Sequence, residues 1–462
     1  MPRQTLRRRA LRLTTATAVL LATALLGATT SLAATTPLRG LQLHSLWSSS
    51  GPGTIKRELD ISRDLGANVV RLDVGWSSLE TAGKGRMSDG YVQRLDQFVN
   101  GADARGIKVI VTLWGTPCWA SSAPEAIKQS CSGSWWDRGV TQYPPTDAGD
   151  YGDISRWVTA RYGTKLAALE VWNEPNLDDD RFWKSDDEAG DYVKLLRAAY
   201  PAAKAGNADV PVLGGSLAAA DKPFLDRMYA AGAKGYYDGI SIHPYNEWRD
   251  PANMWQEKWR KYTLVPGTQW IREGQLAAGD KTPIWITEFG WTTCKGMNWC
   301  VSQKQQAAYT ARSVRIIADR LPYVRAATVY DLRDEGNSKT RMDDNFGIVR
   351  HDYSPKPVYA ALKSAWAGKY GKPKNRVRLS VRRHRSSLLV RGRAKAGTVL
   401  YLRLVRCGRR CSTVRAAAAS RRLVVGATGR FRVRLGHLGQ RERGRVSVRV
   451  ARPAPAARRR AS

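Results

Sequence analysis

Apolar residues follow two alternating patterns between Pro37 and about Trp366. Short, nearly continuous apolar runs predict buried parallel strands, and longer segments with an apolar residue every three or four positions predict amphipathic helices. We expect eight strands, over residues 41–46, 68–74, 107–114, 166–172, 210–214, 239–243, 284–288 and 326–332. Helices are expected over residues 55–65, 91–105, 154–162, 192–205, 224–231, 305–321 and 358–366.

This strand-then-helix repeat predicts the fold of residues 37–366. Eight units in about 330 residues match a (β/α)8 TIM barrel, an α/β fold whose active site lies at the carboxyl ends of the strands. An open, doubly wound sheet is the alternative. It is disfavoured because no Gly-x-Gly-x-x-Gly turn follows the first strand, and residues 214–216 lack the lysine and spacing of a phosphate loop.

The pattern changes after Trp366. Residues 367–375 are rich in Gly and Lys and are expected to be a linker. Over residues 376–450 apolar residues alternate with arginines, which predicts six or seven short strands with one buried face. We expect a small all-β sandwich there, and the turn at residues 427–430 resembles hairpins of immunoglobulin-like sandwiches appended to secreted bacterial enzymes. Residues 451–462 are expected to be a disordered basic tail.

The first 33 residues have the features of a secretory signal peptide. Five arginines precede an Ala/Leu/Thr stretch that ends near Leu26, and Ser31-Leu32-Ala33 provides a small-residue cleavage site. An uncleaved membrane anchor is the weaker reading, because the apolar run is shorter than the ~20 residues of a membrane span. Arg8 and Arg9 leave twin-arginine export open beside the general route. Since no later stretch predicts a transmembrane span, we expect a secreted or cell-wall associated protein.

The six cysteines fit an oxidising compartment, and they are close in sequence in three pairs. Local disulfides are therefore expected between Cys118 and Cys131, between Cys294 and Cys300, and between Cys407 and Cys411. A zinc site is the alternative, but the C-x-x-C spacing and a nearby histidine are missing.

The formal net charge of +35 is concentrated near the carboxyl terminus. Residues 371–462 hold 28 Lys and Arg against the single Glu442, whereas the region between the signal and residue 371 is close to neutral. An extracellular module of this charge is expected to bind an anionic cell-wall polymer or acidic polysaccharide through residues 376–462. Nucleic acid is the second expectation, weaker because the stacking aromatics that such proteins use are limited here to Tyr401 and Phe431, and membrane lipid headgroups are the third. Alternatively, the arginines only make the module soluble.

Two predicted strands end at or just before a glutamate. Glu174 lies just after the strand predicted over residues 166–172, where Pro175 prevents the strand from continuing and keeps Glu174 out of the αR region. Glu288 ends the run at residues 284–288. Two such carboxyls can hydrolyse a glycosidic bond when one is protonated and the other ionised. The acid protonates the leaving oxygen, and the carboxylate attacks the anomeric carbon or activates water. This chemistry needs no cofactor and no metal.

Both glutamates lie in characteristic motifs. Trp172-Asn173-Glu174-Pro175 and Thr287-Glu288-Phe289-Gly290-Trp291 resemble the strand-4 and strand-7 signatures of the clan A retaining glycoside hydrolases. The chain resembles family 39 and related exopolysaccharide endoglycosidases, with the family 5 cellulases as second choice. The supporting residues are 115–120, 242–245, 330–334, 346–348 and 355–357. The resemblance implies a retaining enzyme in which Glu174 is the general acid/base and Glu288 is the nucleophile.

Polar residues at other strand ends are expected to serve this pair. Asn173 can donate its amide to the sugar 2-hydroxyl. Tyr245 can hydrogen-bond the nucleophile, and Arg71 can keep it ionised by charge. His243 is expected to hold substrate or orient the acid, and His44 to be structural or to serve an outer subsite.

Sugar rings present apolar C–H faces that pack on indole rings. Six tryptophans lie at or just after predicted strand ends: Trp47, Trp76, Trp114, Trp119, Trp248 and Trp291. A row of them would wall an open groove and favour internal cleavage of a β-linked polysaccharide, whereas ordinary packing is the alternative for each. Asp331 and Arg333 depart from the tryptophan common on strand 8 of the clan, so the resemblance does not identify the subsite nearest the cleaved bond.

Two other classes of protein compete with an enzyme. One is a carbohydrate-binding protein whose barrel has lost turnover, and the other is a cell-wall adhesion protein that works through its basic module. The intact pair of glutamates favours the enzyme.

Overall fold

The structure, a computed structural model, describes residues 36–46, 52–253, 257–368, 378–384, 387–393, 399–407, 414–424, 430–435 and 443–450. The expected signal peptide, the expected basic tail and most of the expected linker lie outside these residues. Among the helices of the described ranges, none has the length and apolar character needed to cross a membrane.

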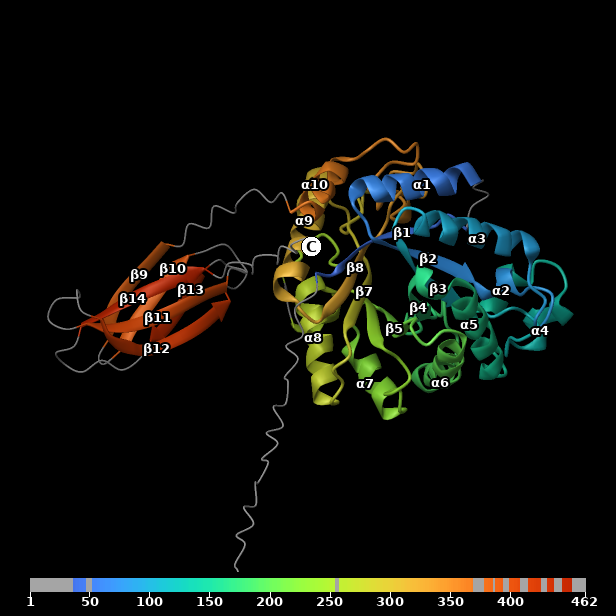
Figure 1. Ribbon diagram of the computed structural model, residues 1–462, viewed down its shortest axis with the longest axis horizontal. Coiled ribbons are helices and arrows are strands. Elements are labelled where there is room, and N and C mark those ends of the chain that lie inside the picture. Colours follow the sequence, from blue (N-terminus) through green and yellow to red (C-terminus); the bar gives the residue numbers. More distant parts are fainter. Residues whose placement is uncertain are drawn as a thin grey trace, which may run out of the picture. The chain divides into compact units, whose positions relative to one another are not determined.

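Eight parallel strands close into a barrel in sequence order, and β8 pairs with β1 to complete it (Figure 1). The strands are β1 (Leu38–Leu43), β2 (Val69–Gly75), β3 (Lys108–Trp114), β4 (Leu166–Val171), β5 (Val212–Ala218), β6 (Gly239–His243), β7 (Ile284–Phe289) and β8 (Val324–Val329). Each strand overlaps a predicted run, and the predicted (β/α)8 barrel is confirmed. The strands are buried on both faces, which explains their nearly continuous apolar sequences.

Two strands differ from their predicted bounds. β5 runs to Ala218, four residues beyond its predicted end, because a bulge follows Gly214 and the next residue, Gly215, takes a φ of +103°. β8 stops at Val329, three residues before its predicted end, where the chain enters the loop at the barrel mouth.

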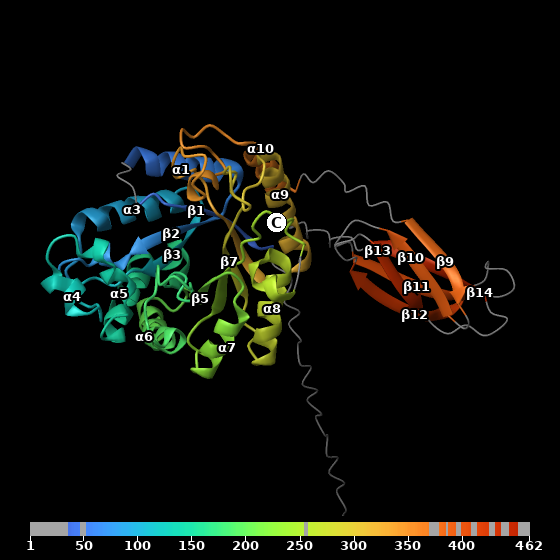
Figure 2. The ribbon, with the colours of Figure 1, turned by 180° about the vertical axis from the view of Figure 1, so that it is seen from behind.

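Helices pack around the outside of the barrel (Figure 2). The long ones are α1 (Pro52–Leu65), α3 (Asp89–Asp103), α5 (Ala148–Tyr162), α6 (Glu188–Gly206), α7 (Lys222–Ala230), α8 (Leu264–Ala277), α9 (Gln303–Arg320) and α10 (Pro357–Trp366). The short helices are α2 (Trp76–Leu79) and α4 (Glu125–Lys128). The sequence pattern misses α8, because its buried stripe includes Gly267, Thr268 and Gln275 in place of large apolar residues.

The inside of the barrel changes from apolar to polar toward the carboxyl ends of the strands. One cluster of strand residues is apolar: Val69, Ile110, Ala167, Ala168, Leu213, Trp285 and Ala326. Two residues further along their strands, Arg71, Thr112 and Glu170 are buried polar side chains. The strand register sets Arg71 beside Gln42 and Thr112 beside Glu170. This polar layer lies next to the strand ends and supports the residues there.

The carboxyl-terminal region forms two antiparallel sheets of three strands each, in the orders β13-β10-β9 and β12-β11-β14. The strands are β9 (Arg378–His384), β10 (Ser387–Arg393), β11 (Val399–Cys407), β12 (Val414–Val424), β13 (Arg430–Leu435) and β14 (Arg443–Val450). All six overlap the apolar and arginine alternation, so the separate all-β region expected from the sequence is confirmed.

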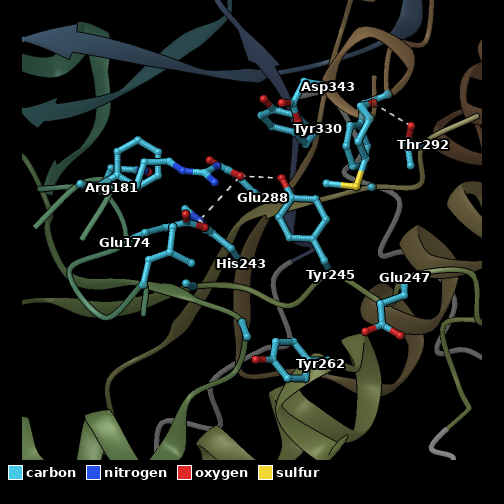
Figure 3. A pocket seen from close by; sticks show the side chains of 18 of the residues that line it. Glu174, Arg181, His243, Tyr245, Glu247, Tyr262, Glu288, Thr292, Tyr330 and Asp343 are labelled. Atoms are coloured by element: carbon cyan, nitrogen blue, oxygen red, sulfur yellow. Dashed lines mark hydrogen bonds and ion pairs between the residues drawn. The ribbon is translucent and has the colours of Figure 1, made fainter. Parts of the chain in front are cut away.

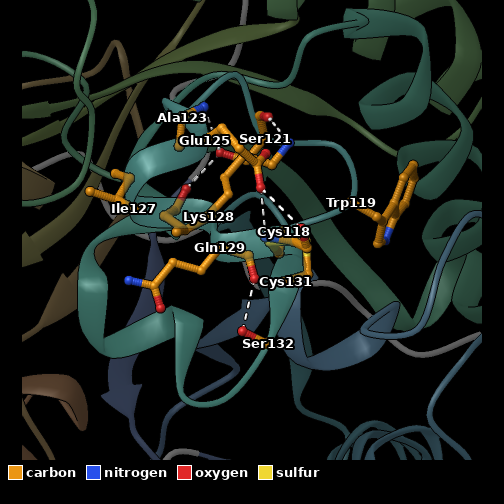
Figure 4. The surroundings of a disulfide bond; sticks show 12 residues. Cys118, Trp119, Ser121, Ala123, Glu125, Ile127, Lys128, Gln129, Cys131 and Ser132 are labelled. Atoms are coloured by element: carbon orange, nitrogen blue, oxygen red, sulfur yellow. Dashed lines mark hydrogen bonds between the residues drawn. A yellow bond between two sulfur atoms is a disulfide. The ribbon is translucent and has the colours of Figure 1, made fainter.

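Two of the three expected disulfides are present. Cys118 is bonded to Cys131, and this bond ties the loop after β3 to the segment that follows α4 (Figure 4). Cys294 is bonded to Cys300 in the loop after β7. The third expected partner, Cys411, lies outside the described residues, so its pairing stays a prediction.

Candidate active site

A cavity of about 340 Å³ lies at the carboxyl ends of the barrel strands (Figure 3). Both predicted glutamates line it, together with Asn173, His243 and Tyr245. These side chains come from the ends of β4, β6 and β7 and from the residues that follow. The expectation that strand ends bring these residues together therefore agrees with the structure.

Glu288, near the end of β7, is only 7% exposed and accepts two hydrogen bonds. Arg71 Nη1 donates to its Oε1 over 2.6 Å, and the Tyr245 hydroxyl donates to its Oε2 over 2.6 Å. His243 Nδ1 lies 3.6 Å from the same Oε2. Burial raises the pKa of Glu288, and the charges of His243 and Arg71 oppose that rise. Both carboxylate oxygens thus face cationic or hydroxyl donors.

Arg71, in β2, is fully buried and organises the polar layer. Its Nε donates to Glu170 Oε2 over 2.7 Å, and its Nη1 also donates to Gln42 Oε1 over 2.9 Å. Its Nη2 donates to Asn173 Oδ1 over 2.8 Å. Burial disfavours the charged guanidinium, but the charges of Glu170 and Glu288 outweigh it and raise the pKa of Arg71. Arg71 is therefore a permanent cation among these acceptors.

The chain turns sharply where β4 ends. Trp172 has a φ of +68° and Glu174 a φ of +45°, in the left-handed region that residues other than glycine rarely adopt. The Glu174 N–H donates to the Ser216 carbonyl over 2.9 Å, which holds this turn against β5. Backbone strain of this kind often accompanies a functional site. Here it accompanies a Glu174 side chain that lies in the cavity.

His243, the last residue of β6, bridges the two glutamates. Its Nδ1 lies 2.8 Å from Glu174 Oε1 and faces Glu288, and its Nε2 lies 3.1 Å from Thr287 Oγ1. Burial disfavours the imidazolium, but the charges of Glu288 and Glu174 outweigh it and raise the pKa of His243. One oxygen of Glu174 and one of Glu288 lie within 4.8 Å of each other.

Asn173 lies at the edge of this network. Its Oδ1 accepts from Arg71, so its two amide N–H groups are available to a ligand in the cavity that Asn173 lines. This is the orientation that donation to a sugar hydroxyl requires.

Most of the predicted tryptophan wall is absent from the cavity. Trp76 is fully buried and makes an edge contact with Trp119, whose Nε1 donates to a backbone carbonyl. Neither residue lines the cavity, and neither does Trp114, which packs edge-on against Phe182. These indoles are held by neighbouring loops, a packing that the sequence pattern does not reveal.

The remaining predicted tryptophans differ in position. Trp291 lines the cavity but is 2% exposed, and its Nε1 donates to the Arg249 carbonyl. Trp248 is exposed beneath the Arg249 guanidinium. Trp47 lies outside the described residues.

Other aromatic residues take the expected place of the tryptophans. Tyr245, Tyr330 and Phe346 line the cavity and contact one another edge to face. Tyr330 directly follows β8, so an aromatic residue does stand at that strand end. It lies one position before Asp331, which the sequence analysis compared with the tryptophan common on strand 8 of the clan. Phe182, Tyr262 and Trp299 line the cavity as well.

A second polar cluster adjoins the cavity at His44. His44 Nδ1 lies 3.5 Å from Asp73 Oδ2, and its Nε2 lies 3.5 Å from Glu335 and 3.9 Å from Asp331. Burial disfavours its charged form, but Asp73 and the other two carboxyls outweigh that effect and raise the pKa of His44 to about 9. Burial also raises the pKa of Asp331 well above its usual range.

The polar layer contains residues that the sequence analysis missed. Glu170 and Gln42 hold Arg71, and Thr287 and Ser216 face His243. Glu170 had a visible signal, since a carboxylate inside an otherwise apolar strand requires a buried partner. The others are ordinary polar residues whose neighbours only the fold reveals.

Two sets of side chains are close enough to surround one metal ion. They are Glu174 with His243 and Glu288, and His44 with Asp331 and Glu335. In the first set Arg71 already provides a cation to Glu288, so a metal ion there would face an adjacent positive charge.

Comparison with known proteins agrees with this geometry. The model of the cellulase family, glycosyl hydrolase family 5, matches residues 29–324. A beta-glucosidase from Agrobacterium sp. (strain ATCC 21400) is 26% identical over 122 residues, which cover 26% of this chain and 23% of that protein.

Solved structures share the fold. A family 39 glycoside hydrolase from the gut symbiont Bacteroides cellulosilyticus WH2 has a TM-score of 0.57 at 20% identity, covering 87% of this chain and 80% of that one. A monomeric beta-xylosidase from Caulobacter crescentus CB15 has a TM-score of 0.50 at 17% identity, covering 89% and 95%.

The resemblance to clan A glycoside hydrolases is confirmed. Of the two families expected, family 5 matches by its family model, and family 39 is found among proteins of the same fold. The matched region runs from residue 29 into β8 and contains both glutamates, Asn173, His243 and Arg71. The chain therefore belongs to the cellulase family, glycosyl hydrolase family 5, and is a glycoside hydrolase.

Proposed function

We propose that this enzyme hydrolyses a β-linked polysaccharide with retention of anomeric configuration, using Glu174 as acid/base and Glu288 as nucleophile. The observation that carries this proposal is the short distance between the two carboxyls: an oxygen of Glu174 lies within 4.8 Å of an oxygen of Glu288. Retaining glycosidases hold their two carboxyls ~5–5.5 Å apart, whereas inverting enzymes leave ~6.5–9.5 Å for a water molecule. The short separation supports direct attack.

The two roles follow from the donors around each carboxyl. Arg71 stays charged, and burial raises the pKa of Tyr245 well above its usual range, so both remain donors at neutral pH. Both donors stabilise the ionised form of Glu288 and oppose the rise in pKa that its burial causes. Glu288 is therefore suited to attack. Glu174, whose side chain contacts His243, takes the role of the acid/base.

The reaction then has two steps. Glu288 attacks the anomeric carbon while the bond to the leaving oxygen breaks and Glu174 donates its proton to that oxygen. Glu174, now ionised, takes a proton from water, the water oxygen attacks the anomeric carbon, and Glu288 is released. The Asn173 amide is placed to bind the 2-hydroxyl, a contact that strengthens in the transition state.

The names of similar proteins support a β-linked substrate, since they include a beta-glucosidase and a beta-xylosidase. Internal cleavage of a chain belongs to the same proposal. Its support is now a cavity walled by tyrosine, phenylalanine and Trp299, in place of the expected row of tryptophans.

Secretion is likewise proposed, with residues 1–33 as the signal peptide, residues 37–366 as the catalytic barrel and residues 376–450 as an immunoglobulin-like sandwich. The support is the signal-like amino terminus together with two disulfides, which persist in oxidising compartments.

The basic carboxyl-terminal module is proposed to hold the enzyme on an anionic cell-wall polymer. In the β13-β10-β9 sheet, Arg391 lies directly opposite Arg432, and both side chains are exposed. Like charges in opposite positions destabilise a sheet. The three strands contain no acidic residue that could offset them, so an external anion is the partner that this face favours.

The full chain should be tested against a panel of soluble β-linked polysaccharides, with Glu174→Gln, Glu288→Gln and the surface control Glu273→Gln. We expect Glu288→Gln to abolish turnover and prevent a covalent glycosyl intermediate detectable by mass spectrometry. Glu174→Gln should slow natural substrates by about 10²–10⁴-fold but leave activated aryl glycosides partly competent. Two glutamine variants that cleave as fast as the parent would refute the mechanism.

A further inference from the structure

Trp299 is an exposed indole at the cavity. Its side chain is 43% exposed, and it lines the same cavity as Glu174 and Glu288. Among the described residues three other tryptophans are at least 37% exposed: Trp136, Trp248 and Trp259. None of these three lines the cavity. An exposed ring of this size has surface left to contact a ligand, unlike the buried Trp291.

The segment that carries Trp299 is held in place by several bonds. The disulfide between Cys294 and Cys300 joins two residues six positions apart and closes the segment into a short loop. At its base the Val301 N–H donates to the Thr292 carbonyl over 2.9 Å. A further bond joins the Lys295 N–H to the Lys339 carbonyl of the loop after β8, over 2.7 Å. The indole is therefore presented from a closed loop with a limited range of positions.

The loop that carries Trp299 lies a short way along the chain from Glu288 and lines the same cavity. Trp299 comes eleven residues after Glu288, in the loop that leaves β7. Trp291 and Thr292, which line the cavity, separate Glu288 from the disulfide-closed loop. Glu288 itself is enclosed by Arg71, Tyr245 and His243. The groups that contact Glu288 are thus polar, and Trp299 is not among them.

We propose that Trp299 forms an outer subsite that stacks against a second pyranose ring of a β-linked chain. The inference rests on the proposed glycosidase function and deepens it, because it makes chain length a determinant of specificity. The flat indole matches the apolar C–H face of a pyranose. Because its loop is already closed by the disulfide, little conformational entropy is lost when a ligand binds.

A contact with another protein is the competing explanation, since Met297 in the same loop is 42% exposed. Met297, however, does not line the cavity, whereas Trp299 does. The cavity position favours a ligand that also reaches the glutamates.

The test compares one-ring and multi-ring substrates in the full chain. The variants are Trp299→Ala, Trp299→Phe and, as a matched exposed tryptophan away from the cavity, Trp136→Ala. Substrates are the 4-nitrophenyl β-glucoside, β-xyloside and β-mannoside, and the β-1,4-linked hexaoses of the same three sugars. We expect Trp299→Ala to lower kcat/KM for the hexaose about tenfold, mainly through KM, the upper range of an aromatic contact. The aryl glycoside should change less than twofold.

The controls decide between subsite and general damage. Trp299→Phe should recover most of the hexaose activity, and Trp136→Ala should change neither substrate. An equal loss on both substrates, or no loss on the hexaose, would overturn the subsite. If the parent cleaves none of the six compounds, the proposed function fails for these sugars. Gel retardation by the corresponding polysaccharides then tests the subsite: loss of retardation in Trp299→Ala supports it, and unchanged retardation refutes it.

Discussion

At the scale of single residues, Arg71 connects the stability of the barrel to its chemistry. It is fully buried and donates to Gln42, Glu170, Asn173 and Glu288. A buried charge is tolerated only when such partners surround it, and removing one partner of a buried ion pair costs about 3–5 kcal/mol of unfolding free energy. The group that helps to ionise the proposed nucleophile is thus also required to keep Glu170 inside the barrel.

His44 provides a pH-dependent contribution at the same scale. Its pKa is about 9 in the folded protein, against 6.5 for an unperturbed histidine. A raised folded pKa adds stability that is complete below pH ~6.5 and disappears as pH rises through ~9. Urea unfolding of the parent should therefore lose on the order of 3 kcal/mol between pH 6 and 9.5 that His44→Gln does not lose. Parallel losses in both proteins would mean that His44 has no such role.

At the scale of elements, the strands were predictable and several contacts between loops were not. A strand that is buried on both faces needs apolar side chains at nearly every position. Each barrel strand therefore overlapped an apolar run that predicted it. α8 escaped because glycine, threonine and glutamine form part of its buried stripe. The tryptophans at residues 76, 114 and 119 were misplaced because their surroundings come from distant loops.

The candidate site divides in the same way. Glu174, Glu288, Asn173, His243 and Tyr245 were predictable because motifs and strand ends place them. Two further partners of Arg71, Gln42 and Glu170, were not predictable, since the register of β1, β2 and β4 in the closed barrel brings them together.

The loop after β3 offers a prediction at the scale of elements. Cys118 and Cys131 are separated by 13 residues, and Cys118 packs with Ala123, Trp135 and Val140 in a small cluster. Chain-entropy arguments give such a crosslink about 3 kcal/mol, and about 2 kcal/mol to the shorter Cys294–Cys300 loop. Thermal melting of the two double Cys→Ser variants should show the larger loss for the first pair. The reverse order would show that strain or local packing outweighs chain entropy.

At the scale of the whole molecule, charge and catalysis occupy different parts of the chain. Residues 371–462 carry 28 basic residues and one acidic residue, whereas both glutamates of the proposed reaction lie in the barrel. Salt should therefore weaken attachment to a polymer far more than it weakens turnover of a soluble neutral substrate.

The paired arginines make this separation testable. Arg391→Gln/Arg432→Gln should elute from immobilised polygalacturonate at clearly lower NaCl than Arg156→Gln/Arg227→Gln, which removes two exposed charges from α5 and α7. Hydrolysis of soluble substrate should be equal in both variants. If both double variants elute at the same NaCl concentration, retention depends on the total positive charge of the chain and not on this sheet face. Tighter retention of the parent on DNA-cellulose than on polygalacturonate would instead favour nucleic acid.

Closure of the barrel has a consequence for biosynthesis. β1 begins at Leu38, and its neighbour β8 ends at Val329. The edge of β1 that pairs with β8 therefore has no partner until the last strand has been synthesised. Until β8 is made, β1 and β7 each present unpaired backbone groups that invite association with other chains. A ribosome-bound chain therefore cannot complete this barrel until β8 has been synthesised.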